Sequence, residues 1–229
     1  MSRGWLVVFA KAPRAGLVKT RLSPPLDLDE CAALYSAMLA DVLEATLGFA
    51  AALDLVPVLA IHPPDATAEL VGRVPAGYRL HPQRGADLGE RMANAFAEAA
   101  AAGATRTLLR GSDSPTLPFA LFEAAIGSLD EGDDVVFSPD QGGGYAMVGL
   151  RSPQPWLFDV PMSTRRMLDE TRALAERAGV RSATTAPGFD LDTIDDLRAV
   201  QRRADGTGDL DLAPRTVESI STLARAHVL

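Results

Sequence analysis

Hydrophobic residues along this chain alternate between short continuous runs and helically spaced positions. The run from Trp5 to Ala10 is apolar throughout, which is typical of a strand buried on both faces of a parallel sheet. Apolar residues then recur at helical spacing from Leu34 to Phe49, with Asp27 or Asp29 available as the cap. Further strands are predicted near 55–61, 78–82 and 107–110, and further helices near 66–72, 88–102 and 118–129. Repeated strand-then-helix units predict right-handed crossovers and a mostly parallel sheet.

The pattern changes after residue 133. Strands are predicted at 135–138 and 145–150 with three glycines and no helix between them, which indicates a local antiparallel or mixed pairing. Ser163 is expected to cap a helix that runs to about Ala178, and Thr193 with Asp196 resembles a capping box that opens another. Pro214 suits the first turn of a final helix. We therefore expect an α/β fold with a mixed sheet and helices on both faces.

Composition narrows the class of protein. The chain has 229 residues, of which 47% are hydrophobic and 23% charged, and no linker-like stretch divides it, so one domain spanning residues 1–229 is expected. A single cysteine excludes an internal disulfide and a cysteine-based zinc cluster, and three scattered histidines make a histidine-based zinc site improbable. No apolar run is long enough for a signal peptide or a membrane span, so we expect a cytoplasmic protein with no membrane partner.

Charge is distributed unevenly. The formal net charge of −8 argues against nucleic acid as a partner, because phosphate backbones require a basic face. Residues 1–26 nevertheless carry five basic side chains and no acid, whereas the rest of the chain carries −13. Lys11 and Lys19, the only lysines in the sequence, both lie in this short segment. This concentration of positive charge indicates a site for a small anion.

The basic segment 9–22, FAKAPRAGLVKTRL, leaves the carboxyl end of the first predicted strand, where open parallel sheets bind their ligands. Its lysines and arginines could neutralise a diphosphate or triphosphate. It is not a P-loop, because Val18 stands where that motif requires glycine, and no dinucleotide-binding glycine pattern follows the strand. The alternative is a solvated basic loop. The predicted nucleotide-binding residues in this segment are Lys11, Arg14, Gly16, Lys19 and Arg21.

Two acidic segments are candidate metal sites. Asp113 follows the predicted strand 107–110, and a carboxylate there is well placed to hold Mg²⁺ or Mn²⁺ against phosphates, with Ser112 expected to contact the nucleotide. An isolated turn aspartate or helix cap is the alternative. Asp190 and Asp192 are spaced by two, so in an extended segment they point to one side, and either could supply the second carboxylate.

Two further segments could contact an acceptor. Gly142 to Gly144 precede Tyr145, and three glycines permit close backbone approach to a ligand, although a plain tight turn is the alternative. Ser163 and Thr164 present hydroxyls at an expected helix start, where either an anion contact or simple capping is possible. The predicted acceptor-side residues are Gly143, Gly144, Tyr145, Ser163 and Thr164.

Taken in order, six segments resemble one known family. They are FAKAPRAGLVKTRL (9–22), DLGERMANAF (87–96), GSDSPTLP (111–118), GGGYAMVGL (142–150), MSTRRML (162–168) and FDLDTIDDL (189–197). The sequence resembles the radical-SAM/selenodomain-associated transferases, within the nucleotide-diphospho-sugar transferase superfamily of glycosyltransferase-A fold. Its K-T-R-L is also similar to the K-S-R-L of phospholactate guanylyltransferases, and the whole resembles molybdenum-cofactor nucleotidyltransferases more distantly.

The resemblance implies a Rossmann-like sheet whose N-terminal basic loop binds nucleotide phosphates. It also implies that Asp113 is the metal-binding aspartate, with a second carboxylate from 190–192. Members are described as glycosyltransferases, some associated with arsenosugar biosynthesis. The chain departs from the family at Gly142, where an aspartate is usual, and at Met162, where a tryptophan is usual, which bears on acceptor choice and activity.

The sequence therefore favours a metal-dependent transferase that uses a nucleotide-sugar donor and a small-molecule acceptor. Asp113, Lys19 and Arg21 are the candidate catalytic residues, acting through electrostatic stabilisation of the leaving phosphates. One alternative is nucleotidyl transfer with release of pyrophosphate. Another is a non-catalytic nucleotide-binding module, which is suggested by Gly142 in place of the aspartate that is usual in the family.

Overall fold

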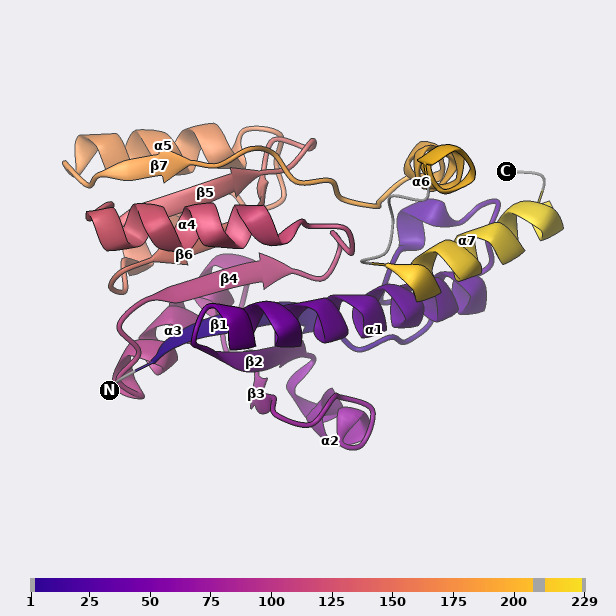
Figure 1. Cartoon of the computed structure of the whole chain (residues 1–229), viewed down its shortest axis with the longest axis horizontal. Coiled ribbons are helices and arrows are strands. Elements are labelled where there is room, and N and C mark those ends of the chain that lie inside the picture. Colours follow the sequence, from indigo (N-terminus) through magenta and orange to yellow (C-terminus); the bar gives the residue numbers. More distant parts are fainter. Residues whose placement is uncertain (1–2, 208–212, 228–229) are drawn as a thin grey trace.

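A seven-stranded mixed sheet forms the centre of the computed structural model, which describes residues 3–207 and 213–227. Its strand order is β3-β2-β1-β4-β6-β5-β7. Only β6 runs antiparallel to its neighbours β4 and β5, and the remaining pairs are parallel (Figure 1). The strands are β1 (Gly4–Lys11), β2 (Leu55–His62), β3 (Arg79–Pro82), β4 (Thr107–Gly111), β5 (Val135–Pro139), β6 (Tyr145–Leu150) and β7 (Ser182–Thr184). The predicted α/β class and mixed sheet are confirmed.

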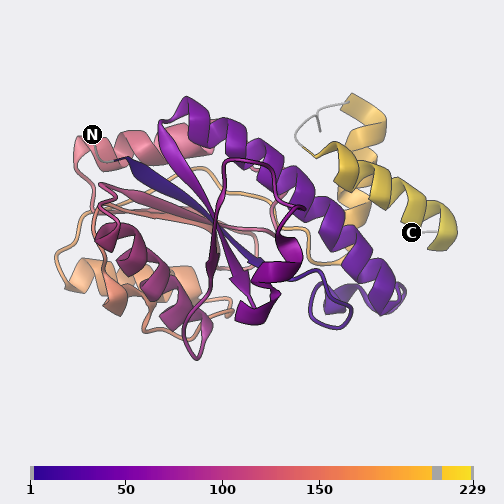
Figure 2. The same cartoon turned by 90° about the horizontal axis from the view of Figure 1, so that it is seen from below.

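Helices cover both faces of the sheet. Figure 2 shows α1 and α4 on one face, α3 and α5 on the other, and α6 and α7 packed beside α1. Leu6 and Leu108 face the side of α1 and α4, whereas Val7 and Leu109 face the side of α3 and α5. The helices are α1 (Leu28–Ala52), α2 (Thr67–Leu70), α3 (Leu88–Ala101), α4 (Phe119–Glu131), α5 (Met167–Arg177), α6 (Ile194–Thr207) and α7 (Pro214–His227), with short 3₁₀ helices at Thr20–Leu22, Pro64–Ala66 and Pro155–Phe158.

Two predicted helix caps are confirmed. The Asp27 carboxylate accepts from the Glu30 amide at 2.8 Å, and the Glu30 carboxylate accepts from the Asp27 amide at 2.9 Å. Asp196 and Thr193 exchange bonds in the same way at the start of α6, at 2.7 Å and 3.3 Å. Both motifs are local in sequence, so the side chain that satisfies the free amide is always within reach.

The start of α5 is predicted wrongly. The helix begins at Met167 rather than after Ser163, and its N-cap, Arg166, makes no capping bond with its side chain. Ser163 has a φ of 61°, in the left-handed region, so the chain turns sharply there instead of entering a helix. The short strand β7 was also not foreseen, because three small residues carry no apolar periodicity.

The C-terminal helices share a core with the basic loop. Leu22 and Leu26 from that loop, Leu191 from the segment before α6, and Leu197 from α6 are all buried in one cluster with α1 and α7. Burial of each such leucine stabilises the fold by about 2 kcal/mol. This cluster therefore fixes the basic loop and the 189–193 segment beside each other, although about 170 residues separate them.

Helix α1 is long and apolar enough, by length and composition alone, to cross a membrane. Within the protein, however, 56% of its most apolar window is buried. Its buried side chains, among them Leu34, Met38 and Phe49, pack against the sheet and against α7. These contacts are typical of the core helix of an α/β domain.

Candidate functional site

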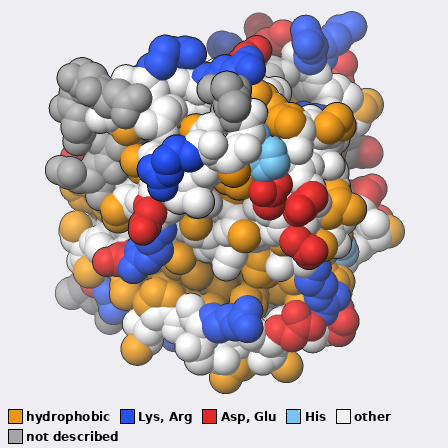
Figure 3. All heavy atoms as spheres, turned by 90° about the vertical axis from the view of Figure 1, so that its right-hand side faces the viewer, with side chains coloured by type: hydrophobic (Ala, Val, Ile, Leu, Met, Phe, Trp, Pro, Cys, Tyr) orange, Lys and Arg blue, Asp and Glu red, His pale blue; other side chains and the backbone are white. Residues whose placement is uncertain are grey.

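Three segments meet beyond the carboxyl ends of β1 and β4. They are the basic loop after β1, the turn at 111–114 after β4, and the segment at 189–193 before α6. Figure 3 views the molecule from this end and shows acidic and basic side chains interspersed with exposed hydrophobic ones. Because parallel strands direct their carboxyl ends to one edge, residues distant in sequence converge here.

Lys19 lies at the centre of this site. Its ammonium group is paired with Asp113 and lies 2.9 Å from Oδ1 of Asp192. Its side chain is only 3% exposed, whereas those of the two aspartates are 49% and 40% exposed. Burial lowers the pKa of Lys19, but the charges of Asp113 and Asp192 raise it more, so the net pKa is raised. The amine is therefore a permanent cation shared by two carboxylates.

Hydrophobic anchors and buried hydrogen bonds hold these segments in place. Val18, beside Lys19, is buried against α1 and β2. The Tyr35 hydroxyl accepts from the Lys11 amide at 3.0 Å and lies 2.7 Å from the Ser112 hydroxyl, so one α1 side chain joins the ends of β1 and β4. The Leu191 amide donates to the Asp113 carbonyl at 2.9 Å, which ties the second acidic segment to the first.

Asp190 has a different environment from Asp192. Its carboxylate accepts a hydrogen bond from Ser114 and lies mostly inside the protein. The pKa of Asp190 is raised to about 6, mainly by burial and also by the neighbouring Asp113, Asp140 and Asp192, against the lowering effect of the Ser114 bond. The environment of Asp190 therefore disfavours its charged form.

The free energy of unfolding is expected to decrease as the pH rises, because of Asp190. The folded carboxyl holds its proton up to about pH 6, whereas the unfolded one releases it near 3.8, so its stabilising contribution is present below 3.8 and is lost by about pH 6. The loss amounts to about 3 kcal/mol. Urea unfolding at pH 4 to 7 should show that Asp190→Asn, which keeps the acceptor for Ser114, lacks this decline. Parallel profiles for the two proteins would contradict the prediction.

The carboxylates fit a divalent cation in part. Asp113 and Asp192 are brought together by the shared Lys19 ammonium, and their side chains remain 49% and 40% exposed, so both carboxylates are accessible to a cation beside Lys19. Two carboxylates completed by water and substrate phosphates are a usual set for Mg²⁺. No group of three potential metal ligands occurs within residues 3–207 and 213–227. The sequence left Asp190 and Asp192 open as the partner of Asp113. In the structure Asp192 reaches Lys19 beside Asp113, whereas the Asp190 carboxylate accepts from Ser114, so Asp113 and Asp192 are the candidate pair.

Of the other predicted phosphate-binding residues, some lie near Lys19 and others have different partners. Arg21 is 74% exposed and its Nη1 lies 3.7 Å from Oδ2 of Asp192, so it flanks Lys19. Lys11 is exposed at the end of β1. Arg14 instead pairs with Glu69 and lies 3.4 Å from Asp65, which turns its guanidinium towards α2. Gly16, with a φ of 79°, and Ser112, buried against Tyr35, shape the site without presenting a free polar side chain to it.

The glycine segment contacts its own chain rather than open space. The Asp140 carboxylate accepts from the amides of Gly142 and Gly144, at 2.6 Å and 2.8 Å. Gly143 has a φ of 87°, and a Cβ there would lie 2.0 Å from the Arg165 carbonyl. The backbone at Gly143 does approach another group closely, as expected, but that group is the Arg165 backbone just before α5 rather than a ligand. Contact of Gly143 and Gly144 with an acceptor stays a prediction.

The remaining acceptor-side residues make local contacts within their own segments. The Tyr145 hydroxyl is buried, and burial raises its pKa against the lowering effect of Thr171. Its ring packs against Phe137 at 5.5 Å between centroids. The Thr164 hydroxyl donates to the Pro161 carbonyl at 3.3 Å, and Ser163 occupies the sharp turn. Tyr145 is thus a half-buried residue that packs against the core, and Ser163 and Thr164 build a turn; their contact with an acceptor stays a prediction.

Substitution of Gly143 should be costly while that of Gly142 is not. In Gly143→Ala the new Cβ requires both a left-handed backbone and displacement of the Arg165 carbonyl, so we expect a loss of at least about 2 kcal/mol of unfolding free energy. In Gly142→Ala the nearest atom, Oδ1 of Asp140, lies 3.4 Å away. Thermal unfolding of both variants tests this. Equal stability of the two would show that the Arg165 backbone moves freely.

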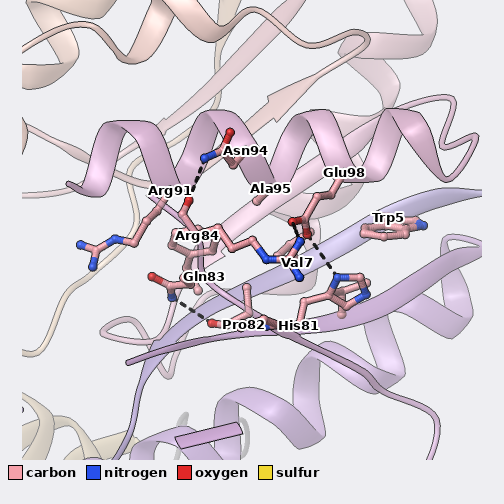
Figure 4. Close-up of a pocket in the computed structure, with 13 residues that line it drawn as sticks. Trp5, Val7, His81, Pro82, Gln83, Arg84, Arg91, Asn94, Ala95 and Glu98 are labelled. Carbon is pink, nitrogen blue, oxygen red and sulfur yellow. Dashed lines mark hydrogen bonds and ion pairs between the residues drawn. The ribbon is translucent and has the colours of Figure 1, made fainter. Parts of the chain in front are cut away.

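Sequence reasoning missed a polar group near the carboxyl ends of β2 and β3. Nη1 of Arg91 lies 2.9 Å from Nδ1 of His62, and burial, Arg91 and Lys11 all lower the pKa of His62. Gln83 is 6% exposed and donates both amide hydrogens, to the carbonyls of Ala10 and Ala60. Figure 4 shows Gln83 and Arg91 directed away from Trp5, which lies at the start of β1. Single polar residues without a motif gave no signal in the sequence.

Solved structures share this architecture. A Desulfovibrio desulfuricans G20 protein that carries the provisional description of nucleotide-diphospho-sugar transferase is 28% identical, with a TM-score of 0.86 over 100% of this chain and 97% of its own. A CMP:2-keto-3-deoxy-manno-octonic acid synthetase complexed with CTP is 13% identical, with a TM-score of 0.59 over 91% of this chain and 100% of its own. The 4-diphosphocytidyl-2C-methyl-D-erythritol synthase of Anaerococcus prevotii DSM 20548 is 9% identical, with a TM-score of 0.55 over 97% of both chains. At such low identities the last two show the fold alone.

Family membership rests on the sequence model. No curated protein matches the chain. The model of one family matches residues 46–164, which include β2, the turn at 111–114 and the glycine segment, and are more than half of the sequence. The chain therefore belongs to the family DUF2064, described as uncharacterized proteins conserved in bacteria.

Proposed function

We propose that this protein is a divalent-metal-dependent transferase that uses an activated nucleotide, with a nucleotide sugar as donor. The observation that carries the proposal is the convergence of Lys19, Asp113 and Asp192 beyond the carboxyl ends of the parallel strands. This is where open α/β sheets bind ligands, and the site combines carboxylates for a cation with a basic loop for phosphates. The similarity to the Desulfovibrio protein supports the same class of substrate.

The residues have separable roles in this proposal. Asp113 and Asp192 would hold Mg²⁺ or Mn²⁺, and a bound divalent cation offsets the charge that develops on the leaving phosphates. Arg21 and Lys11, both exposed, bind the donor's phosphates from the basic loop. Lys19 has three N–H donors, so it can keep one carboxylate and donate to a phosphate oxygen. Reaction then depends on alignment of the acceptor with the donor rather than on a covalent intermediate.

Nucleotidyl transfer is the second candidate. It is favoured by the fold shared with the synthetase that was solved with CTP. In this reaction the acceptor attacks the α-phosphate of a nucleoside triphosphate and releases pyrophosphate, whereas glycosyl transfer breaks the bond between sugar and phosphate and releases a nucleoside diphosphate. The basic loop and the acidic pair serve both reactions. The arsenosugar association is an expectation from the sequence motifs only.

One set of assays separates these candidates. Calorimetry with Mg²⁺ and each nucleoside triphosphate or nucleotide sugar identifies the bound nucleotide, and product analysis with candidate acceptors follows. Release of a nucleoside diphosphate from a nucleotide sugar supports the proposal, and release of pyrophosphate supports nucleotidyl transfer. Metal-dependent binding without turnover across a broad acceptor panel would indicate a binding module. Absence of both binding and turnover would overturn the proposal.

A further inference from the structure

Arg110 is a fully buried cation directly beneath the candidate site. It is the penultimate residue of β4, its exposure is 0%, and its side chain lies on the α1 and α4 face of the sheet, 5.6 Å from the centre of the Phe122 ring. No carboxylate forms an ion pair with it in the described part of the chain. Burial lowers the pKa of Arg110 to about 10, so it remains charged at neutral pH.

The Arg110 guanidinium donates two hydrogen bonds to the turn that carries Asp113 and a third to α1. Nε donates to the Gly111 carbonyl at 3.0 Å, and Nη2 donates to the Ser114 carbonyl. Nη1 donates to the Thr46 hydroxyl of α1 at 3.3 Å. The two carbonyls lie at the two ends of the turn, so a single rigid fork sets the distance between them.

The other groups of the turn are held as well. The Ser112 hydroxyl is bonded to Tyr35, the Asp113 carbonyl accepts from Leu191, and the Ser114 hydroxyl donates to Asp190. Among the polar side chains of residues 111–114, only that of Asp113 is directed outwards, to Lys19. The turn is therefore clamped from below while its one carboxylate points into the site.

We infer that Arg110 is a positioning residue, which fixes the 111–114 turn and through it the placement of Asp113 against Lys19. A buried guanidinium without an ion-pair partner among the described residues is expensive even with Asp190 nearby, and an apolar side chain would fill the same space without that cost. The hydrogen bonds that Arg110 donates to the carbonyls at both ends of the turn offset this cost. The importance of Asp113 for catalysis rests on the proposed function, but its placement by Arg110 does not.

The two lysines of the chain provide a direct test. In protein labelled with ¹⁵N-lysine, the Lys19 ammonium, held by two carboxylates, should exchange its protons with water slowly, and the exposed Lys11 should exchange them fast. In Arg110→Met, of similar length but without donors, we expect Lys19 exchange to rise at least about tenfold because Asp113 loses its fixed position. Arg110→Gln, which keeps two N–H donors, should give an intermediate rate.

Leu108→Ala is the matched control. Leu108 lies on the same strand and face, two residues before Arg110, but has no hydrogen bond to the turn. Its loss should lower overall stability while Lys19 exchange stays near the wild-type rate. A Met variant that is folded by circular dichroism and leaves Lys19 exchange within about twofold of wild type would overturn the inference. So would an equal rise in Leu108→Ala, or fast exchange of both lysines in the wild type.

Two features keep this test decisive. If Arg110→Met does not fold, the Gln variant is judged by the same criterion, since its side chain can still donate to one carbonyl. The spectra require neither nucleotide nor metal. A protein that shows the expected exchange rates but binds no nucleotide would refute the proposed function and leave the role of Arg110 intact.

Discussion

Replacement of Asp113 by asparagine is expected to weaken metal-dependent nucleotide binding about 100-fold, equivalent to about 2.7 kcal/mol. The variant removes one of the two carboxylates proposed to hold the cation, and it leaves the buried Lys19 paired with Asp192. The size follows from the loss of one charged ligand of the proposed cation beside a lysine side chain that is only 3% exposed. Calorimetry with Mn²⁺ and the nucleotide panel measures the change, and the Mn²⁺ signal in electron paramagnetic resonance reports bound metal separately.

Asp195→Asn is the control for this loss. Asp195 lies a few residues from Asp192, but its side chain is 86% exposed and pairs with Arg198, at 2.9 Å, one turn along α6. An exposed pair of this kind contributes little, so binding should stay within about twofold of wild type. If Asp113→Asn binds nucleotide and metal as tightly as wild type, then the metal site has been assigned to the wrong residue.

Replacement of Asp41 by alanine is expected to cost about 4 kcal/mol of unfolding free energy. The Asp41 side chain on α1 is completely buried. It accepts from the Thr216 amide at 2.7 Å and hydroxyl at 2.8 Å, and Nη1 of Arg215 lies 3.1 Å from it. These donors lie in the first turn of α7, where amides have no partner within the helix. Without the carboxylate, α7 loses its attachment to α1.

Urea unfolding of Asp41→Ala and Glu44→Ala tests this anchor. Glu44 lies one turn further along α1 and contacts the same Arg215 at 2.6 Å, but its side chain is 66% exposed. We expect Glu44→Ala to cost less than about 1 kcal/mol. Similar small losses in both variants would mean that hydrophobic packing alone, and not the buried carboxylate, holds α7 on α1.

The sequence predicted most of the fold because the signals for it are local. The apolar run at 5–10, the helical spacing from Leu34 to Phe49 and the capping residues Asp27 and Thr193 each act within a few residues of themselves. The lack of a helix between the strands predicted at 135–138 and 145–150 indicated antiparallel or mixed pairing, and β5 and β6 pair antiparallel in the structure. Strand β7 and the true start of α5 were not predicted, because turns and three-residue strands show little periodic pattern of hydrophobic residues.

The candidate site was only partly predictable, for a related reason. Charge statistics identified the basic loop, and position after a strand identified Asp113, but neither shows which groups meet. Asp190 and Asp192 were indistinguishable in sequence, and only burial separates them: Asp190 lies inside against Ser114, whereas Asp192 reaches Lys19. The glycines at 143 and 144 indicated that another group packs closely against the backbone there, but a glycine does not specify whether that group is a ligand or part of the protein.

The sequence by itself determined the class of fold, the helix caps, and the presence of a basic loop and an acidic turn at strand ends. Only the tertiary structure decided that Lys19 is shared by Asp113 and Asp192, and that Arg110 and Tyr35 brace the turn from below. The physical reason is the separation along the sequence over which each kind of interaction acts. Periodicity and capping act between neighbours in the chain, whereas the free energy of a buried charge depends on partners that folding brings from far along the sequence.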